Sequence, residues 1–462
     1  MRDCPDNGMP AGSRFLLSSQ KAATFGLRGI LHSIRQHHRA KVQSSLGANV
    51  MTSGWNRSRM AMTGVVLLSL VLRVCESAQA SEALERVVAE YLASGKMADY
   101  ERAVAELRRH PERPFSGCVA VVKRVMLASI SKTTSPGAAV CVLPSGPGPS
   151  LGRYAVRIPT GYDPGKKHPL ILALAGGPGD GEKYLPSWER LTANTDFIVA
   201  CPVAGGTMWW KTAYLIALET LADCKRRYNV DTNRVCVTGV SNGGMGAWFM
   251  AVNFPDLFAA AGSIAGAPVT RTDQSVDPGY LVNLLNLPIY FVHGENDTTI
   301  PAKYDRRASE ILKEAGYDFV YEEVHGGGHG VPAAYTQKLL DWLVKRTRNP
   351  NPQRVKFRKR MAEPRTCYWL HLGKTRRDSF VEAQISNQSE IAIRATNVQQ
   401  MTLYLSDALV DFDKEISVRV NDRVAFTGRR KPRPEVALKT AKLFEDTERI
   451  YGDELAVSLQ AE

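Results

Sequence analysis

The sequence lacks the residue spacings that bind most metal ions. Its 8 cysteines include no C-x-x-C pair and no Cys/His arrangement typical of a zinc site. Asp407, Asp411 and Asp413 lie close together, but the segment has neither the glycine nor the terminal glutamate of a Ca²⁺-binding loop. The glycine-rich stretch LALAGGPGDG, residues 172–181, lacks the Lys-Ser/Thr of a phosphate-binding P-loop. We therefore expect no metal and no cofactor.

The excess of positive charge is concentrated near the N-terminus and not in the rest of the chain. The formal net charge is +13, but more than half of this excess falls within residues 1–60. We therefore expect no nucleic acid partner. The other basic runs are KFRKR at 356–360, KTRR at 374–377 and GRRKPR at 428–433, and we expect a solvated face there. Contact with an acidic polysaccharide or a membrane surface through these runs is the alternative.

The apolar run near the N-terminus, Ala61 to Leu72, is too short to span a bilayer comfortably. It follows Arg57 and Arg59 and leads to the segment Ala78-Gln79-Ala80. A basic region, a short apolar region and an A-x-A exit are typical of a secretory signal peptide. The pattern predicts a leader over residues 1–80, with the signal peptide at about 51–80, and a secreted or periplasmic protein. A short membrane anchor or a merely apolar N-terminus is the alternative.

The rest of the chain divides by its periodicity. Residues 81–149 read as a helical lead-in followed by a Pro/Gly-rich linker. In residues 150–348 short apolar strands alternate with helices, which predicts a mostly parallel sheet with helices on both faces. Residues 354–430 alternate with period two, which predicts a small C-terminal antiparallel β domain. Residues 431–462 read as a helical tail.

The stretch GVSNGGMG, residues 239–246, carries the first candidate for chemistry. Ser241 stands between Gly239 and Gly243, just after the apolar run VCVTGV and at the start of a predicted helix. A strand that turns at once into a helix strains its corner residue, and flanking glycines let the backbones approach. This is the pattern of a nucleophile elbow, which exposes the serine hydroxyl at the carboxyl end of a strand.

A serine nucleophile needs a base, and the base needs an acid that orients it. Downstream of Ser241, a strand and turn carry Asp297, and a later strand and glycine-rich loop carry His329. The order serine, acid, histidine is that of the predicted fold. Glu295 and His325 are competing candidates. We favour His329 because the three glycines before it give a loop that can reach back over the sheet.

Two further groups of residues are candidates for contact with a substrate. The backbone N–H groups of Asn242 and Gly177 are expected to stabilise an oxyanion, because one follows the nucleophile and the other lies in a loop after an early strand. Trp209 and Trp210 follow another strand and could line a substrate pocket. Core packing of the two tryptophans is the alternative.

Several of these motifs, in this order, resemble the α/β-hydrolase superfamily. They are LALAGGPGDG, RRYNVDTNRVCVTGVSNGGMGAWFMA, HGENDTTIP and HGGGHG. Within it they are similar to secreted esterases related to dienelactone hydrolase, polyhydroxybutyrate depolymerase and feruloyl esterase. The resemblance covers about residues 150–348 and implies an α/β-hydrolase fold with Ser241, Asp297 and His329 as the catalytic triad. In one departure, Ala175 stands where the oxyanion loop usually begins with histidine.

The expected function is that of a secreted serine hydrolase that cleaves carboxylic esters, small or polymeric, through an acyl-enzyme. A serine peptidase of the same superfamily is one alternative. The segment before the first predicted strand, roughly 70 residues after the signal peptide, is too short for a propeller domain of the prolyl-oligopeptidase kind. A non-catalytic protein that binds a surface or carbohydrate is another alternative, and the ordered serine, acid and histidine argue against it.

Overall fold

The computed structural model describes residues 2–3, 81–110, 114–130, 134–144, 152–268 and 275–459. From Ala83 onward these residues belong to one compact unit. No helix among them combines the length and the apolar character needed to cross a membrane. The signal peptide expected at about 51–80 lies outside the described residues.

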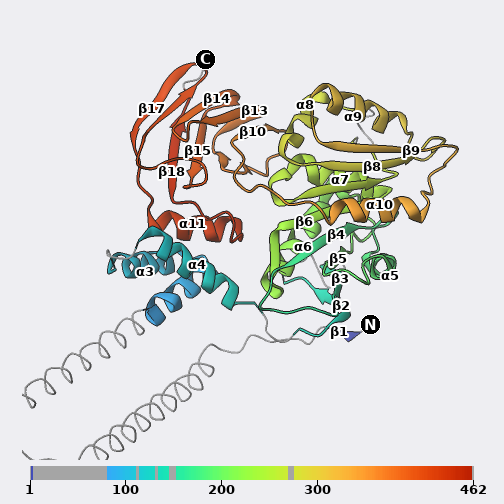
Figure 1. The fold of residues 1–462 in the computed structure, drawn as a ribbon, viewed down its shortest axis with the longest axis horizontal. Helices are drawn as coiled ribbons and strands as arrows, with labels where there is room; N and C mark the ends of the chain where they lie inside the picture. The colour runs from blue at the N-terminus through green and yellow to red at the C-terminus, as the bar shows by residue number, and fades with distance from the viewer. Residues whose placement is uncertain are drawn as a thin grey trace, which may run out of the picture. The chain divides into compact units, whose positions relative to one another are not determined.

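A mostly parallel sheet of nine strands forms the α/β domain, which comprises residues 137–348 and the short strand at residues 2–3 (Figure 1). The strands are β1 (Arg2–Asp3), β2 (Gly137–Val142), β3 (Arg153–Ile158), β4 (His168–Leu174), β5 (Ile198–Pro202), β6 (Val230–Val240), β7 (Ala260–Ile264), β8 (Ile289–Gly294) and β9 (Phe319–Val324). Their order is β1-β2-β3-β5-β4-β6-β7-β8-β9, and β3 is antiparallel to both of its neighbours. Every residue of β4 is buried, as expected for a strand between two helical layers.

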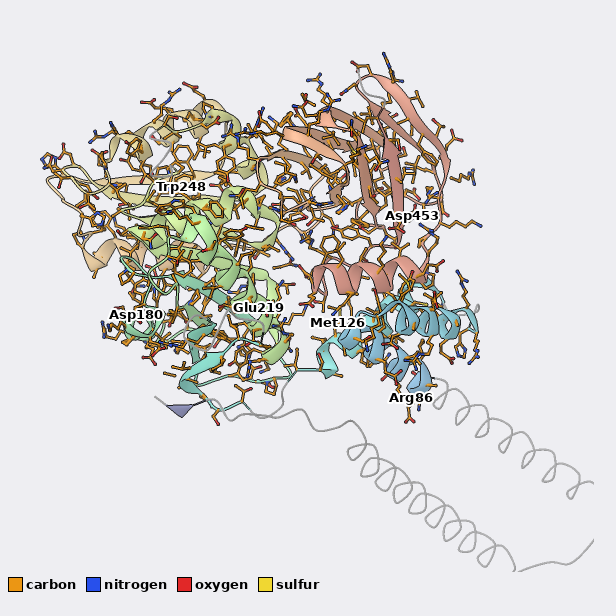
Figure 2. The ribbon with its side chains drawn as sticks, turned by 180° about the vertical axis from the view of Figure 1, so that it is seen from behind. Arg86, Met126, Asp180, Glu219, Trp248 and Asp453 are labelled. Carbon is orange, nitrogen blue, oxygen red and sulfur yellow. The ribbon has the colours of Figure 1, made fainter. Side chains whose placement is uncertain are left out.

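Helices cover both faces of this sheet, as the sequence predicts. They include α5 (Gly181–Leu191), α6 (Tyr214–Arg227), α7 (Asn242–Asn253), α9 (Lys303–Glu314) and α10 (Ala333–Leu343). Trp188 of α5 and Leu339 of α10 share an apolar cluster with Tyr290 of β8. The next residue of β8, Phe291, packs instead on Trp248 of α7, with ring centroids 5.0 Å apart. Trp248 is labelled in Figure 2. Because successive strand residues point to opposite faces, α5 and α10 lie on one face and α7 on the other.

Two sheets packed around a shared apolar core form the β domain, residues 354–459. The first sheet has the order β10-β13-β14-β16-β17, and the second has the order β11-β12-β15-β18. All neighbouring strands of both sheets are antiparallel except β14 and β16, which are parallel. The strands are β10 (Arg354–Lys359), β11 (Thr366–Cys367), β12 (Leu370–Leu372), β13 (Thr375–Ser386), β14 (Glu390–Val398), β15 (Gln400–Leu405), β16 (Glu415–Val420), β17 (Arg423–Arg429) and β18 (Asp453–Ser458).

Two segments differ from the sequence-based boundaries. β2 lies in the expected lead-in and linker, yet it pairs with β3 and so extends the α/β sheet. The expected helical tail is helical only in α11 (Pro434–Phe444), because β18 pairs along its full length with β15. Leu438 and Ala441 of α11 pack on the lead-in helices α3 (Met97–Arg108) and α4 (Phe115–Ala128) (Figure 1).

Buried ion pairs join the β domain to the α/β domain. Arg348, just after α10, lies 2.7 Å from a carboxylate oxygen of Asp446, and Arg449 lies 2.7 Å from one of Asp256. All four side chains are almost completely inaccessible to solvent. Burial by itself would raise the pKa of Asp446, but the charges of Arg348 and Lys225 hold it well below its ordinary value. Removing one partner of such a pair leaves a buried charge uncompensated, so these contacts fix the two domains together.

Candidate active site

Ser241 occupies a sharp corner between β6 and α7. Its φ is 56° and its ψ is −119°, a conformation that costs free energy for a residue with a side chain. The glycines on either side permit the turn. A Cβ on Gly239 would lie 2.2 Å from the carbonyl oxygen of Gly243, and one on Gly243 would lie 1.9 Å from that of Leu174. The local sequence therefore folds as a nucleophile elbow should.

His329 links Ser241 to Asp297. Its Nε2 lies 2.8 Å from the Ser241 hydroxyl oxygen, and its Nδ1 lies 2.7 Å from Oδ2 of Asp297. Asp297 follows β8 in the sheet and His329 follows β9, so both approach Ser241 from the carboxyl ends of the strands. The structure thus brings together the three residues that the sequence predicts as nucleophile, acid and base.

Both oxygens of the Asp297 carboxylate accept hydrogen bonds. Its Oδ1 accepts hydrogen bonds from the backbone N–H groups of Thr299 at 2.8 Å and Ile300 at 3.0 Å. Burial alone would raise the pKa of Asp297, but the hydrogen bonds from His329 and from this backbone lower it. Asp297 is therefore ionised at neutral pH and can hold the imidazole of His329 in one orientation.

The two competing candidates contact each other and not Ser241. Nδ1 of His325 lies 2.8 Å from the Glu295 carboxylate, which also accepts a hydrogen bond from the N–H of Gly326. The His325 side chain is 98% exposed, whereas that of His329 is 32% exposed. This separate pair leaves Asp297 as the carboxylate in contact with His329.

The loop that carries Gly177 lies beside the nucleophile. A Cβ on Gly176 would stand 3.3 Å from Cβ of Ser241, and the Asn242 side-chain amide donates to the carbonyl oxygen of Gly177 at 2.8 Å. Within the described residues, no hydrogen bond takes up the backbone N–H of Asn242 or of Gly177. These two N–H groups therefore remain candidate donors for an oxyanion.

The expectation that Trp209 contacts a substrate is wrong, because the residue has no exposed surface. Its indole N–H donates to the carbonyl oxygen of Ala175 at 2.9 Å, and its ring lies against Gly179 and Gly246. Trp209 therefore supports the loop after β4 at Ala175, the position where the oxyanion loops of similar proteins carry histidine. The sequence offered one signal for this role, which was the absence of that histidine.

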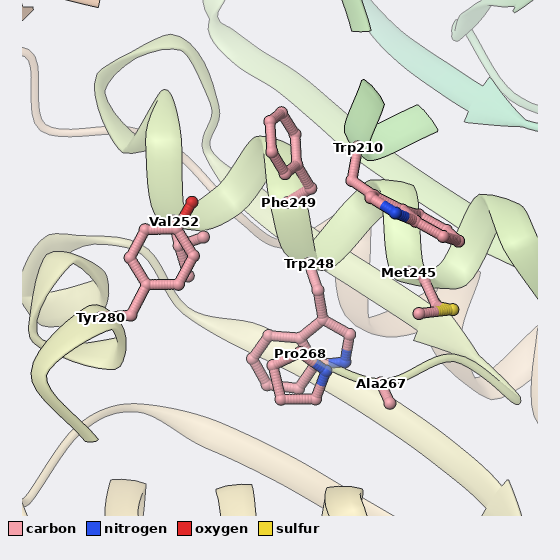
Figure 3. Close-up of a pocket in the computed structure, with 8 residues that line it drawn as sticks. All are labelled: Trp210, Met245, Trp248, Phe249, Val252, Ala267, Pro268 and Tyr280. Carbon is pink, nitrogen blue, oxygen red and sulfur yellow. The ribbon is translucent and has the colours of Figure 1, made fainter. Parts of the chain in front are cut away.

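Trp210 lines a small apolar pocket on the α7 side of the sheet (Figure 3). Its volume is about 30 Å³, and the other lining residues are Met245, Trp248, Phe249, Val252, Ala267, Pro268 and Tyr280. A larger pocket of about 530 Å³ lies on the α5 and α10 side and is lined by His329. Its walls include Tyr184, Arg190 and Gln337, so it combines apolar with hydrogen-bonding surface.

Two basic runs of the β domain, 356–360 and 428–433, form ion pairs with acidic residues. Glu382 lies within ion-pair distance of Arg354 and Lys356, and Asp453 lies within that distance of Arg430 and Arg433. Asp378 pairs in the same way with two further arginines of the first run. Part of the positive charge of these runs is therefore paired with acidic residues within the fold.

Fold and motif order together define the class of this protein. A mostly parallel sheet with one antiparallel strand near its edge, and a serine elbow after a central strand, are the features of an α/β-hydrolase. Within that class, residues 203–345 match the family described as the Dienelactone hydrolase family. The resemblance expected from the sequence is confirmed.

Known proteins are similar to parts of this chain. A bifunctional acetylxylan esterase/xylanase of Neocallimastix patriciarum is 30% identical over 141 residues, which cover 29% of this chain and 20% of that protein. Acetylxylan esterase A of Aspergillus oryzae is 25% identical over 221 residues, covering 38% of this chain and 70% of its own length. A solved thermostable esterase is 25% identical, with a TM-score of 0.38 and coverage of 44% and 61%. The chain thus spans only a fifth of the length of the first of these relatives.

Proposed function

We propose that this protein is a serine hydrolase that cleaves carboxylic esters through an acyl-enzyme intermediate. The contact chain from Ser241 through His329 to Asp297, at 2.8 and 2.7 Å, is the observation that carries the proposal. These distances are those of hydrogen bonds through which a base can activate a serine hydroxyl.

The proposed reaction has two halves. The Ser241 oxygen attacks the ester carbonyl carbon while His329 Nε2 takes the serine proton, and the N–H groups of Asn242 and Gly177 stabilise the oxyanion. The intermediate collapses, and His329 gives its proton to the departing alkoxide, which leaves as an alcohol. Water then attacks the acyl-serine, His329 accepts the proton of that water, and the released Ser241 oxygen regains it. Asp297 stays ionised throughout and stabilises the imidazolium.

The substrate that we propose is an ester on a small molecule or on a polysaccharide. The relatives named acetylxylan esterases support the polymeric choice. The 530 Å³ pocket beside His329 has the volume that a sugar-sized group needs.

We also propose that the protein is exported, with cleavage of the signal peptide near Ser81. We further propose that exposed basic residues of the β domain, such as Arg376 and Arg377, contact an acidic polymer. N-terminal sequencing of the exported protein tests the cleavage.

Hydrolysis of p-nitrophenyl acetate, p-nitrophenyl butyrate, methyl ferulate and acetylated xylan by the purified protein tests the activity. Ser241→Ala should lose about 10⁶-fold in kcat on any ester that is cleaved. Ser309→Ala is the matched control, because Ser309 is a partly exposed serine on α9 whose hydroxyl bonds only to the carbonyl oxygen of Arg306, three residues earlier. A Ser241→Ala variant that keeps a tenth of the wild-type rate refutes the proposal. Cleavage of peptide p-nitroanilides in place of all esters would assign a peptidase.

A further inference from the structure

A buried histidine and a buried aspartate lie directly behind Asp297. His293 is in β8 and Asp305 is in α9, and neither side chain has any exposed surface. His293 Nδ1 lies 2.7 Å from Oδ2 of Asp305. On the other side of the ring, Nε2 lies 2.7 Å from the carbonyl oxygen of Ile300 and 3.2 Å from Oδ2 of Asp297.

These contacts determine how many protons the pair carries. A carbonyl oxygen can only accept, so the proton between Ile300 and the ring must be on Nε2. A second proton must lie between Nδ1 and Asp305, on either the nitrogen or the oxygen, because two lone pairs 2.7 Å apart would repel each other. The pair is therefore neutral overall in both arrangements, which is how titratable groups are tolerated in a dry interior.

The titration behaviour of the two groups agrees with a shared proton. Burial raises the pKa of Asp305 to about 6, although His293 opposes the shift. Burial by itself would lower the pKa of His293, but the Asp305 carboxylate, together with the Ile300 carbonyl group and Asp297, raises it.

We propose that His293 and Asp305 are positioning residues that fix the turn carrying Asp297. The Nε2–H of His293 bonds the carbonyl oxygen of Ile300 and faces one oxygen of Asp297, while the N–H of Ile300 bonds the other oxygen. Each oxygen of the Asp297 carboxylate thus has a donor beside it, and these contacts restrain the carboxylate from rotating away from His329. Asp305 acts through His293, because its contact with Nδ1 sets the ring orientation that points Nε2–H at the turn. The inference rests on the proposed function, since it requires Asp297 to serve as the acid.

Two substitutions of His293, by side chains of equal length, test the role of the Nε2–H donor. His293→Gln can place an amide N–H near the position of Nε2, whereas His293→Met has similar volume and no donor. We expect His293→Met to lose about 10- to 100-fold in kcat, because small misplacements of a catalytic group cost this much. KM should change by less than about threefold, because neither residue lines the pockets. His293→Gln should recover most of the lost kcat. Titration of active sites with a fluorophosphonate normalises kcat to folded enzyme.

Asp305→Asn gives an independent test in a conservative variant. Its amide can donate to Nδ1 and so keep the proton on Nε2, and kcat should stay within about fivefold of wild type. Equal kcat for His293→Met and wild type would overturn the inference, as would an equal loss in His293→Gln and His293→Met. A loss in Asp305→Asn as large as that in His293→Met would overturn it too. None of these outcomes bears on the proposed function, which is tested separately by the activity of Ser241→Ala and by the choice between esters and peptide p-nitroanilides as substrates.

Discussion

Replacing Asp297 by asparagine should disable the proposed base without displacing it. The surrounding backbone dictates which way the new amide points. The N–H groups of Thr299 and Ile300 both donate to Oδ1, at 2.8 and 3.0 Å, so the amide oxygen must stay there. The amide NH₂ group is then forced into the place of Oδ2, 2.7 Å from Nδ1 of His329.

That orientation of the amide stabilises the tautomer of His329 that cannot act as a base towards Ser241. An NH₂ group can only donate to Nδ1, so the proton of neutral His329 moves to Nε2. Nε2 is the atom 2.8 Å from the Ser241 oxygen, and once protonated it cannot accept the serine proton. The equivalent change in a serine protease triad costs about 10⁴-fold in kcat, which corresponds to ~5.4 kcal/mol of transition-state stabilisation. The Nε2–H of His293 faces the same NH₂ group and opposes this orientation, but it is one donor against the two backbone donors at Oδ1.

Steady-state kinetics on the best p-nitrophenyl ester measure this effect, with Glu295→Gln as the matched control. Glu295 bonds Gly326 and His325 on the surface, so its variant should stay within about threefold of wild-type kcat. The reasoning is refuted if Asp297→Asn keeps more than a tenth of wild-type kcat. A crippled Glu295→Gln beside an active Asp297→Asn would instead transfer the acid to Glu295.

Three further changes have expected outcomes. Gly243→Ala places a Cβ 1.9 Å from a backbone oxygen, so we expect a loss of about 1–3 kcal/mol or more in thermal unfolding together with lost activity. Trp209→Phe removes the hydrogen bond to Ala175 and should lower kcat about 10-fold with KM unchanged, a fraction of what a lost oxyanion donor costs; an unchanged kcat would contradict its role in the loop. Asp446→Asn should cost about 3–5 kcal/mol in denaturant unfolding. Because the folded-state pKa of Asp446 is lowered, its contribution in the wild type is present above about pH 4 and is lost as the pH falls further, which melting curves of both proteins at several pH values can test.

The sequence by itself determined the main elements of the α/β domain and the identity of its elbow. Apolar runs bounded by glycine, proline or a polar residue predict strands β3 to β9 correctly. The signal is strongest in the central strands such as β4 and β5, where burial on both faces leaves a continuous apolar signature. The elbow is equally local, since Gly239 and Gly243 are required by contacts with the immediately adjacent turn and strand. The order of Ser241, Asp297 and His329 follows from strand order alone.

Other features depend on contacts between segments that are distant in the chain. β18 has too short a pattern to be distinguished from a helix, and its pairing with β15 decides its conformation. Trp209 could be an exposed pocket wall or a core residue, and only the approach of the loop at Ala175 buries it. His293 and Asp305 read as ordinary strand and helix residues, and the packing of α9 beside β8 brings them together behind Asp297. Hydrogen bonds require positions correct to a few tenths of an ångström, and only the packed tertiary structure sets distances that finely.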